Sequence, residues 1–141
     1  MRGAEAARGE EMARRRKVLL IDDEPEIIET VKFLLGLKNF EVVAAMDGVE
    51  GLEKAKSEKP DLILLDLILP KLNGYEVCAR LKRDPDTKDI PVLILTARDE
   101  AESILRAYRA GADEYIVKPF TTTVLLEKIN KHLPAAKGST A

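Results

Sequence analysis

Three carboxylates follow two short apolar runs of this chain, and they are the residues best suited to chemistry. Asp22 and Asp23 come directly after residues 18–21, and Asp66 comes directly after residues 62–65. In a parallel sheet the carboxyl ends of the strands open on one edge, so these acidic groups would lie together. Because like charges repel in a site of reduced dielectric, we expect a cation there, and carboxylate oxygens suit Mg²⁺, with Mn²⁺ as the alternative.

Two more polar residues stand where apolar runs end, namely Thr96 and Lys118. With a cation beside it, Asp66 is a candidate nucleophile that would accept a phosphoryl group and form an acyl phosphate. Lys118 would pair with phosphoryl oxygens, and the Thr96 hydroxyl would donate a hydrogen bond to another. The backbone carbonyl of Ile68 would complete the metal ligands.

Each of these residues also has a plainer interpretation when taken alone. An Asp pair after a strand commonly caps a helix or forms a turn. Thr96 alone suggests a turn or cap, and Lys118 before Pro119 suggests a solvated loop lysine. The joint pattern favours a functional site, because all of these residues fall at strand ends of one alternating fold.

Strand and helix patterns alternate five times along the chain. The strand-like runs, rich in Val, Ile and Leu, are residues 17–21, 40–45, 61–66, 91–95 and 114–117. They lack a clean polar alternation, which indicates strands covered on both faces. Apolar stripes at helical spacing lie between and after them. Five such units predict an α/β fold with a doubly wound parallel sheet.

Length and composition indicate one globular domain with short tails. We expect a disordered or frayed extension at 1–14, a domain at 15–134, and a tail or linker stub at 135–141. The apolar fraction of 45% and the charged fraction of 34% are ordinary for a globular protein. The apolar runs are too short for a membrane-spanning helix.

Single residues and net charge limit the function classes further. The lone cysteine, Cys78, excludes an internal disulfide framework and fits a reducing, cytoplasmic location, and its apolar helical face indicates a core residue. His132 near the end of the last helix suggests a surface residue rather than a ligand. The net charge of −2 and the lack of a basic stripe argue against direct nucleic-acid binding.

Four ordered segments of the chain resemble the receiver domain of bacterial two-component response regulators, the CheY-like family. The matching segments are 18–24, 61–67, 91–97 and 113–120. The resemblance extends over about residues 16–134. It implies a flavodoxin-like (βα)5 fold with five parallel strands in the order 2-1-3-4-5.

The resemblance also implies roles for individual residues. Asp66 would be the phosphoacceptor, Asp22 and Asp23 the acidic pair that binds Mg²⁺, and Lys118 the phosphate-contacting lysine, followed by a cis bond to Pro119. Thr96 and Tyr115 would be the switch pair, although Tyr115 alone suggests only a half-buried strand aromatic.

The implied function is that of a signalling switch, active as an enzyme only on its own phosphorylation and dephosphorylation. The donor would be a sensor histidine kinase or a phosphotransfer protein. Phosphorylation would reshape a face made by the fourth helix, fifth strand and fifth helix for a downstream partner. Winged-helix regulators often carry an acidic residue near Val124 that pairs across a receiver dimer, and its absence here argues against that particular dimer. We expect a monomer or weak dimer.

Two positions beside the site tune the phosphoryl lifetime in this family, and here they are Ile68 and Arg98. An apolar Ile68 cannot orient an attacking water, and Arg98 would shield the phosphoryl group. We therefore predict slow self-dephosphorylation.

Three other functions compete with the switch. A phosphohydrolase of the haloacid-dehalogenase type also uses an Asp at a strand end, but it needs a second Asp where this chain has Ile68. A degenerate receiver that only holds partners together would not need the complete set of site residues. A nucleotide-binding protein would need a glycine-rich phosphate loop after the first strand, and none is present.

Overall fold

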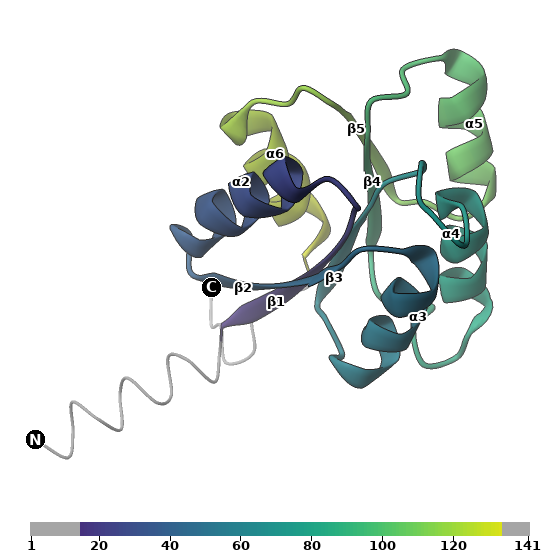
Figure 1. The fold of residues 1–141 in the computed structure, drawn as a ribbon, viewed down its shortest axis with the longest axis horizontal. Coiled ribbons are helices and arrows are strands. Elements are labelled where there is room, and N and C mark those ends of the chain that lie inside the picture. The colour runs from purple at the N-terminus through teal and green to yellow at the C-terminus, as the bar shows by residue number, and fades with distance from the viewer. Residues whose placement is uncertain (1–14, 134–141) are drawn as a thin grey trace, which may run out of the picture.

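The computed structural model describes residues 15–133, which form one five-stranded parallel sheet covered by helices (Figure 1). The strands are β1 (Arg16–Ile21), β2 (Phe40–Ala45), β3 (Leu62–Leu65), β4 (Val92–Thr96) and β5 (Glu114–Val117). The helices are α2 (Pro25–Gly36), α3 (Gly48–Ser57), α4 (Gly74–Arg83), α5 (Ala101–Arg109) and α6 (Thr122–His132). The sheet order is β2-β1-β3-β4-β5, which confirms the predicted fold class and topology.

The central strands are apolar because helices cover both faces of the sheet. Every residue of β3 and β4 is buried, which explains why their sequences show no polar alternation. Helices α2 and α6 lie on one face, and α3, α4 and α5 lie on the other (Figure 1). Side chains from these helices and the sheet form two apolar clusters, one on each face.

Cys78 lies inside the cluster under α4, with none of its surface exposed. Burial raises the pKa of its thiol to about 11. The prediction of a core cysteine is confirmed.

Helix starts are set by local sequence signals at the carboxyl edge of the sheet. Pro25 opens α2, where its missing N–H costs nothing. Asp47, Asn73 and Thr121 cap α3, α4 and α6, because each side chain accepts a hydrogen bond from the backbone N–H three residues later. The strand-to-helix loops are therefore held in place, and these loops carry the candidate site.

The two tails expected at 1–14 and 135–141 lie outside the described residues. Within residues 15–133, none of the helices has the length and apolar character needed to cross a bilayer.

Candidate functional site

The predicted site residues gather at the carboxyl edge of the sheet because four neighbouring strands end there. Asp22 follows β1, Asp66 follows β3, Thr96 is the last residue of β4, and Lys118 follows β5. Backbone bonds hold these ends in register: the Asp66 N–H donates to Ile21 at 3.0 Å, and the Lys118 N–H donates to Thr96 at 2.8 Å.

Lys118 is the centre of this site and contacts three carboxylates. Its Nζ donates to Asp22 Oδ2 at 2.8 Å, to Glu24 Oε1 at 2.9 Å and to Asp66 Oδ2 at 3.0 Å. The Lys118 side chain is only 8% exposed, and those of Asp22 and Asp66 are 0% and 4% exposed. Glu24 covers them from outside, with 55% of its side chain exposed.

Burial and charge oppose each other in this cluster. Burial raises the pKa of Asp22, although the hydrogen bond and the charge of Lys118 act against that rise. Burial would lower the pKa of Lys118, but its bonds to the three carboxylates outweigh that effect and raise it. One ammonium faces three carboxylates, so the site can accept more positive charge.

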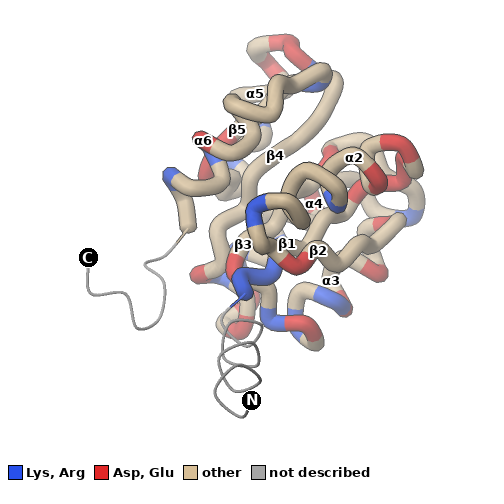
Figure 2. The backbone as a smooth tube through the Cα atoms, turned by 90° about the vertical axis from the view of Figure 1, so that its left-hand side faces the viewer, with Lys and Arg blue, Asp and Glu red and all other residues tan. Residues whose placement is uncertain are grey.

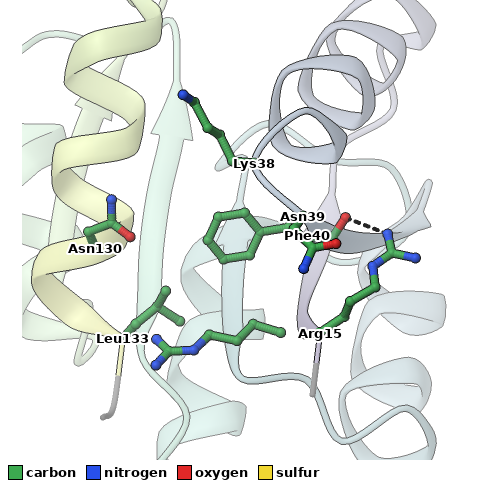
Figure 3. A pocket seen from close by; sticks show the side chains of 7 residues that line it. Arg15, Lys38, Asn39, Phe40, Asn130 and Leu133 are labelled. Carbon is green, nitrogen blue, oxygen red and sulfur yellow. Dashed lines mark hydrogen bonds between the residues drawn. The ribbon is translucent and has the colours of Figure 1, made fainter. Parts of the chain in front are cut away.

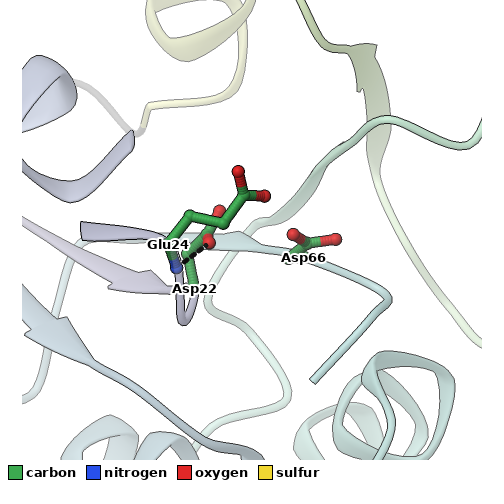
Figure 4. A group of neighbouring side chains, drawn as sticks. All are labelled: Asp22, Glu24 and Asp66. Carbon is green, nitrogen blue, oxygen red and sulfur yellow. Dashed lines mark hydrogen bonds between the residues drawn. The ribbon is translucent and has the colours of Figure 1, made fainter. Parts of the chain in front are cut away.

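Oxygen atoms of Asp22, Glu24 and Asp66 lie within 4.8 Å of one another and can act together as ligands of a hard cation. Figure 4 shows the three carboxylates around one common space. The Asp22 carboxylate also accepts the Glu24 N–H at 2.9 Å, and this tight turn brings Glu24 over the site. Asp23, by contrast, is exposed and is not part of this group.

Glu24 is the functional candidate that the strand-end argument missed. It lies in the loop beyond the strand end, where sequence alone does not show which side chains turn inward. The signal was its place two residues after Asp22, since an Asp side chain commonly bonds the N–H two residues on.

Thr96 is completely buried, and its hydroxyl oxygen has no hydrogen-bond partner among residues 15–133. A buried hydroxyl without a partner costs roughly 1–3 kcal/mol. Because Thr96 ends β4 at the carboxyl edge of the sheet, its hydroxyl is suited to donate a hydrogen bond to a ligand that binds there.

Tyr115 connects β5 to the loop that follows β4. Its hydroxyl donates to the backbone carbonyl of Arg98 at 2.8 Å, and its ring packs against the α4 side of the core. Burial raises the pKa of Tyr115 to about 12, with smaller contributions from Tyr75 and Glu100. Tyr75 is in turn covered by Arg106 of α5, whose guanidinium lies 4.0 Å from the ring centroid. The half-buried position expected for Tyr115 is thus observed.

The loop after Asp66 packs too tightly for a side chain at Gly74. A Cβ there would collide with the Asp66 carbonyl oxygen and the Leu67 backbone, so glycine is required for this close approach. The Ile68 N–H donates to Asp66 Oδ1 at 3.1 Å, while the Ile68 side chain is 54% exposed. Arg98 is exposed, and the Lys118–Pro119 bond is cis as expected.

With this geometry established, comparison with known proteins gives one consistent answer. Residues 18–130 match the sequence model of a protein family, the response regulator receiver domain. The DNA-binding dual master transcriptional regulator RpaA of Synechocystis sp. is 42% identical over 113 residues, which are 80% of this chain and 47% of that protein. The chain spans about half the length of the curated relatives it matches.

Solved structures agree with the fold. The chemotaxis protein CheY4 of Vibrio cholerae is 32% identical, with a TM-score of 0.79 over 84% of this chain and 99% of that one. The receiver domain of the sensor histidine kinase PA1611 of Pseudomonas aeruginosa is 25% identical, with a TM-score of 0.78 over 83% and 96% of the two chains. That structure has a magnesium ion coordinated in its active site cleft.

Proposed function

Because this chain belongs to the family of response regulator receiver domains, we propose that it is a phosphorylation-controlled switch in a two-component phosphorelay. The observation that carries the proposal is the Lys118 cluster, in which Asp66 lies beside a lysine and two further carboxylates at one sheet edge. This is the charge arrangement that phosphoryl transfer needs, since that reaction depends on positioning and on charge neutralisation.

Asp66 is the proposed phosphoacceptor. An oxygen of its carboxylate attacks phosphorus, the P–N bond of a donor phosphohistidine breaks, and the electron pair leaves with the imidazole nitrogen. The product is an acyl phosphate on Asp66. Lys118, already 3.0 Å from Asp66 Oδ2, would then pair with a phosphoryl oxygen.

The carboxylates fit a divalent cation, because they are hard oxygen donors that outnumber the nearby ammonium. We propose Mg²⁺, with Mn²⁺ as an alternative, held by Asp22 and Asp66 together with the Ile68 carbonyl. Glu24, whose carboxylate lies in the same group, is a further candidate ligand. Asp23, the other ligand predicted from the sequence, is exposed and would join by turning inward when the cation binds. When bound, the cation would neutralise charge on the phosphoryl oxygens. The magnesium in the PA1611 receiver supports this assignment.

The proposed output begins at Thr96. A dianionic group on Asp66 would attract the Thr96 hydroxyl, which has no hydrogen-bond partner within residues 15–133. A shift of the loop after β4 would then change the Tyr115–Arg98 bond. The face formed by α5, β5 and α6 would then change shape. This face carries exposed apolar side chains from all three elements, namely Leu105, Tyr108, Val117 and Val124.

The proposed partners are a sensor histidine kinase or phosphotransfer protein as donor, and a downstream effector on the α5–β5–α6 face. A monomer or weak dimer and a cytoplasmic location belong to the same proposal.

We also propose a long phosphoryl lifetime, because the exposed Ile68 side chain offers no group to orient water. Arg98 of the adjacent loop would shield the phosphoryl group.

The test is the intact mass of the full chain after incubation with acetyl phosphate, with and without Mg²⁺. We expect one phosphoryl adduct that requires Mg²⁺ and is absent from an Asp66→Asn variant. An adduct that persists in that variant, or one indifferent to Mg²⁺, would contradict the proposal. After donor removal the adduct should last minutes or longer, and decay in seconds that is unchanged by Arg98→Ala would exclude the lifetime proposal.

A further inference from the structure

A second charged site lies at the opposite, amino edge of the sheet, beside the beginning of β1. It is a pocket of about 360 Å³ between the turn that follows α2 and the last turn of α6. Its lining residues are Arg15, Arg16, Lys38, Asn39, Phe40, Asn130 and Leu133. Three of the seven are cationic and none is acidic, and Figure 2 shows the basic start of β1.

The alternation of β1 separates Arg16 from the nearby acids. Lys17 has acidic neighbours: its Nζ lies 3.1 Å from Glu58 Oε1, and its backbone N–H donates to Asp61. Arg16, one residue earlier, points to the opposite face of the strand. Among residues 15–133 no carboxylate forms a salt bridge with Arg16, and the same holds for Lys38.

Local backbone structure fixes the pocket walls. Arg15 Nη2 donates to the Phe40 carbonyl at 2.9 Å, which joins β1 to β2 at the rim. The Arg15 Nε is buried and has no hydrogen-bond partner among the described residues. Asn39 has a φ of 66°, a left-handed conformation that Asn tolerates, and it ends the turn that carries Lys38. Figure 3 shows the Phe40 ring facing Asn130 of α6 and Leu133, which follows that helix, with Lys38 nearby.

Helix dipoles provide a plainer explanation for some of these cations. The carboxyl ends of α2 and α6 both lie here, and each carries roughly half a negative charge. Two such ends amount to about one negative charge, against the three positive side chains of the pocket. The dipoles therefore account for only part of the positive charge, and the rest is available to an anion.

We propose that this pocket binds the phosphate group of a small anionic ligand. Guanidinium and ammonium groups supply charge-assisted donors, and the Asn39 and Asn130 amides supply neutral ones. The volume suits a mononucleotide-sized molecule or smaller. Either inorganic phosphate or a phosphate monoester meets this chemistry, and the proposal does not depend on phosphorylation of Asp66.

The test is a ¹H–¹⁵N correlation titration of the full chain with inorganic phosphate and, separately, with adenosine monophosphate. EDTA is present in both titrations so that no metal bridges a phosphate to the acidic edge. We expect saturable shifts centred on Asn39, Phe40 and Asn130. The double variant Arg16→Gln/Lys38→Gln should weaken binding by about tenfold or more, because it removes two of the cationic donors while keeping side chains of similar length.

Lys32→Gln is the matched control, because Lys32 is exposed on α2 but does not line this pocket. Equal binding of both probes identifies a simple phosphate site, and preference for adenosine monophosphate identifies a monoester site; both support the proposal. Unsaturable shifts, shifts centred on Asp22 and Asp66, or an equal loss in Lys32→Gln would overturn it.

Discussion

Strand β5 carries a charged cluster at each end, and the two clusters have opposite compositions. At the carboxyl end, one lysine, Lys118, contacts three carboxylates. At the amino end, one carboxylate, Glu114, contacts three basic side chains. Glu114 Oε1 lies 3.0 Å from His132 Nε2 and 3.4 Å from Lys131 Nζ, and Oε2 lies 3.4 Å from Lys128 Nζ.

The two clusters differ in what they leave unsatisfied. Around Glu114 the central carboxylate accepts bonds from several donors. One is Tyr108 of α5, at 3.4 Å, and the basic partners are three side chains of α6. Around Lys118 the excess charge is buried: Asp22 and Asp66 are almost inaccessible and, within the described part of the chain, share one ammonium. A buried excess of one sign favours binding of the opposite charge, whereas a buried charge that is already surrounded by opposite charges mainly holds elements together.

The largest expected effect comes from removing the centre of the acidic cluster. Lys118→Met should cost about 3 kcal/mol of unfolding free energy without metal, because it leaves buried carboxylates uncompensated. It should also slow formation of the phosphoryl adduct by about 100-fold, as expected when a charge-stabilising group is lost. Urea unfolding and the mass assay measure the two effects.

Lys128→Met is the matched control at the other end of β5. It should lower the unfolding free energy by less than about 1 kcal/mol, because the Lys128 side chain is 35% exposed. The rate of adduct formation should stay unchanged. If the two variants behaved alike, the distinction between a binding cluster and a structural cluster would be wrong.

A smaller effect is expected from the pH response of the basic cluster. Burial would raise the pKa of Glu114, but the His132 hydrogen bond and the Lys128 and Lys131 charges lower it from 4.5 to about 2. Because the folded pKa is depressed, the stabilisation is complete above the unfolded pKa and is lost as the pH falls from 4.5 toward 2. Over this pH range the unfolding free energy of the wild type should fall by about 1–2 kcal/mol relative to that of Glu114→Gln.

Urea unfolding at several pH values in this window gives the difference. The control is Glu127→Gln on α6, the helix that carries Lys128, Lys131 and His132. Parallel pH curves for the wild type and Glu114→Gln would show that Glu114 is not a coupled charge.

The smallest effect concerns Glu24. Its side chain is 55% exposed, so its ion pair with Lys118 is weakened by solvent. Glu24→Gln should reduce Mg²⁺ affinity by about two- to threefold, as one partly screened ligand charge would. Isothermal titration with Mg²⁺ measures this, beside Glu26→Gln, an exposed acid of the same region. A loss as large in Glu26→Gln would mean that only the overall charge matters.

Periodicity and strand-end positions were sufficient to predict the sheet. The runs that end at Asp66 and Thr96 are apolar throughout because helices cover both faces of these strands. A short continuous apolar run is typical of such a buried parallel strand, so the sequence predicts it directly. Topology then places the residues that follow parallel strands on one edge. This is why the sequence alone predicts that Asp22, Asp66 and Lys118 lie together.

Side-chain direction in the loops could not be predicted in the same way. Asp23 and Glu24 are neighbours after β1, yet Glu24 reaches Lys118 and Asp23 is exposed. His132, expected at the surface, instead has a side chain only 20% exposed and lies against Glu114. Both results depend on contacts between residues far apart in the chain, which local patterns do not encode.

The burial of Cys78 makes this protein convenient for thiol labelling. It is the only cysteine of the chain, none of its surface is exposed, and its raised pKa leaves almost no thiolate at neutral pH. A cysteine introduced at an exposed position such as Leu105 would therefore react alone with a maleimide dye or spin label. Because Cys78 would not react with the label, one chosen surface can be observed by fluorescence or electron paramagnetic resonance without first replacing a native cysteine.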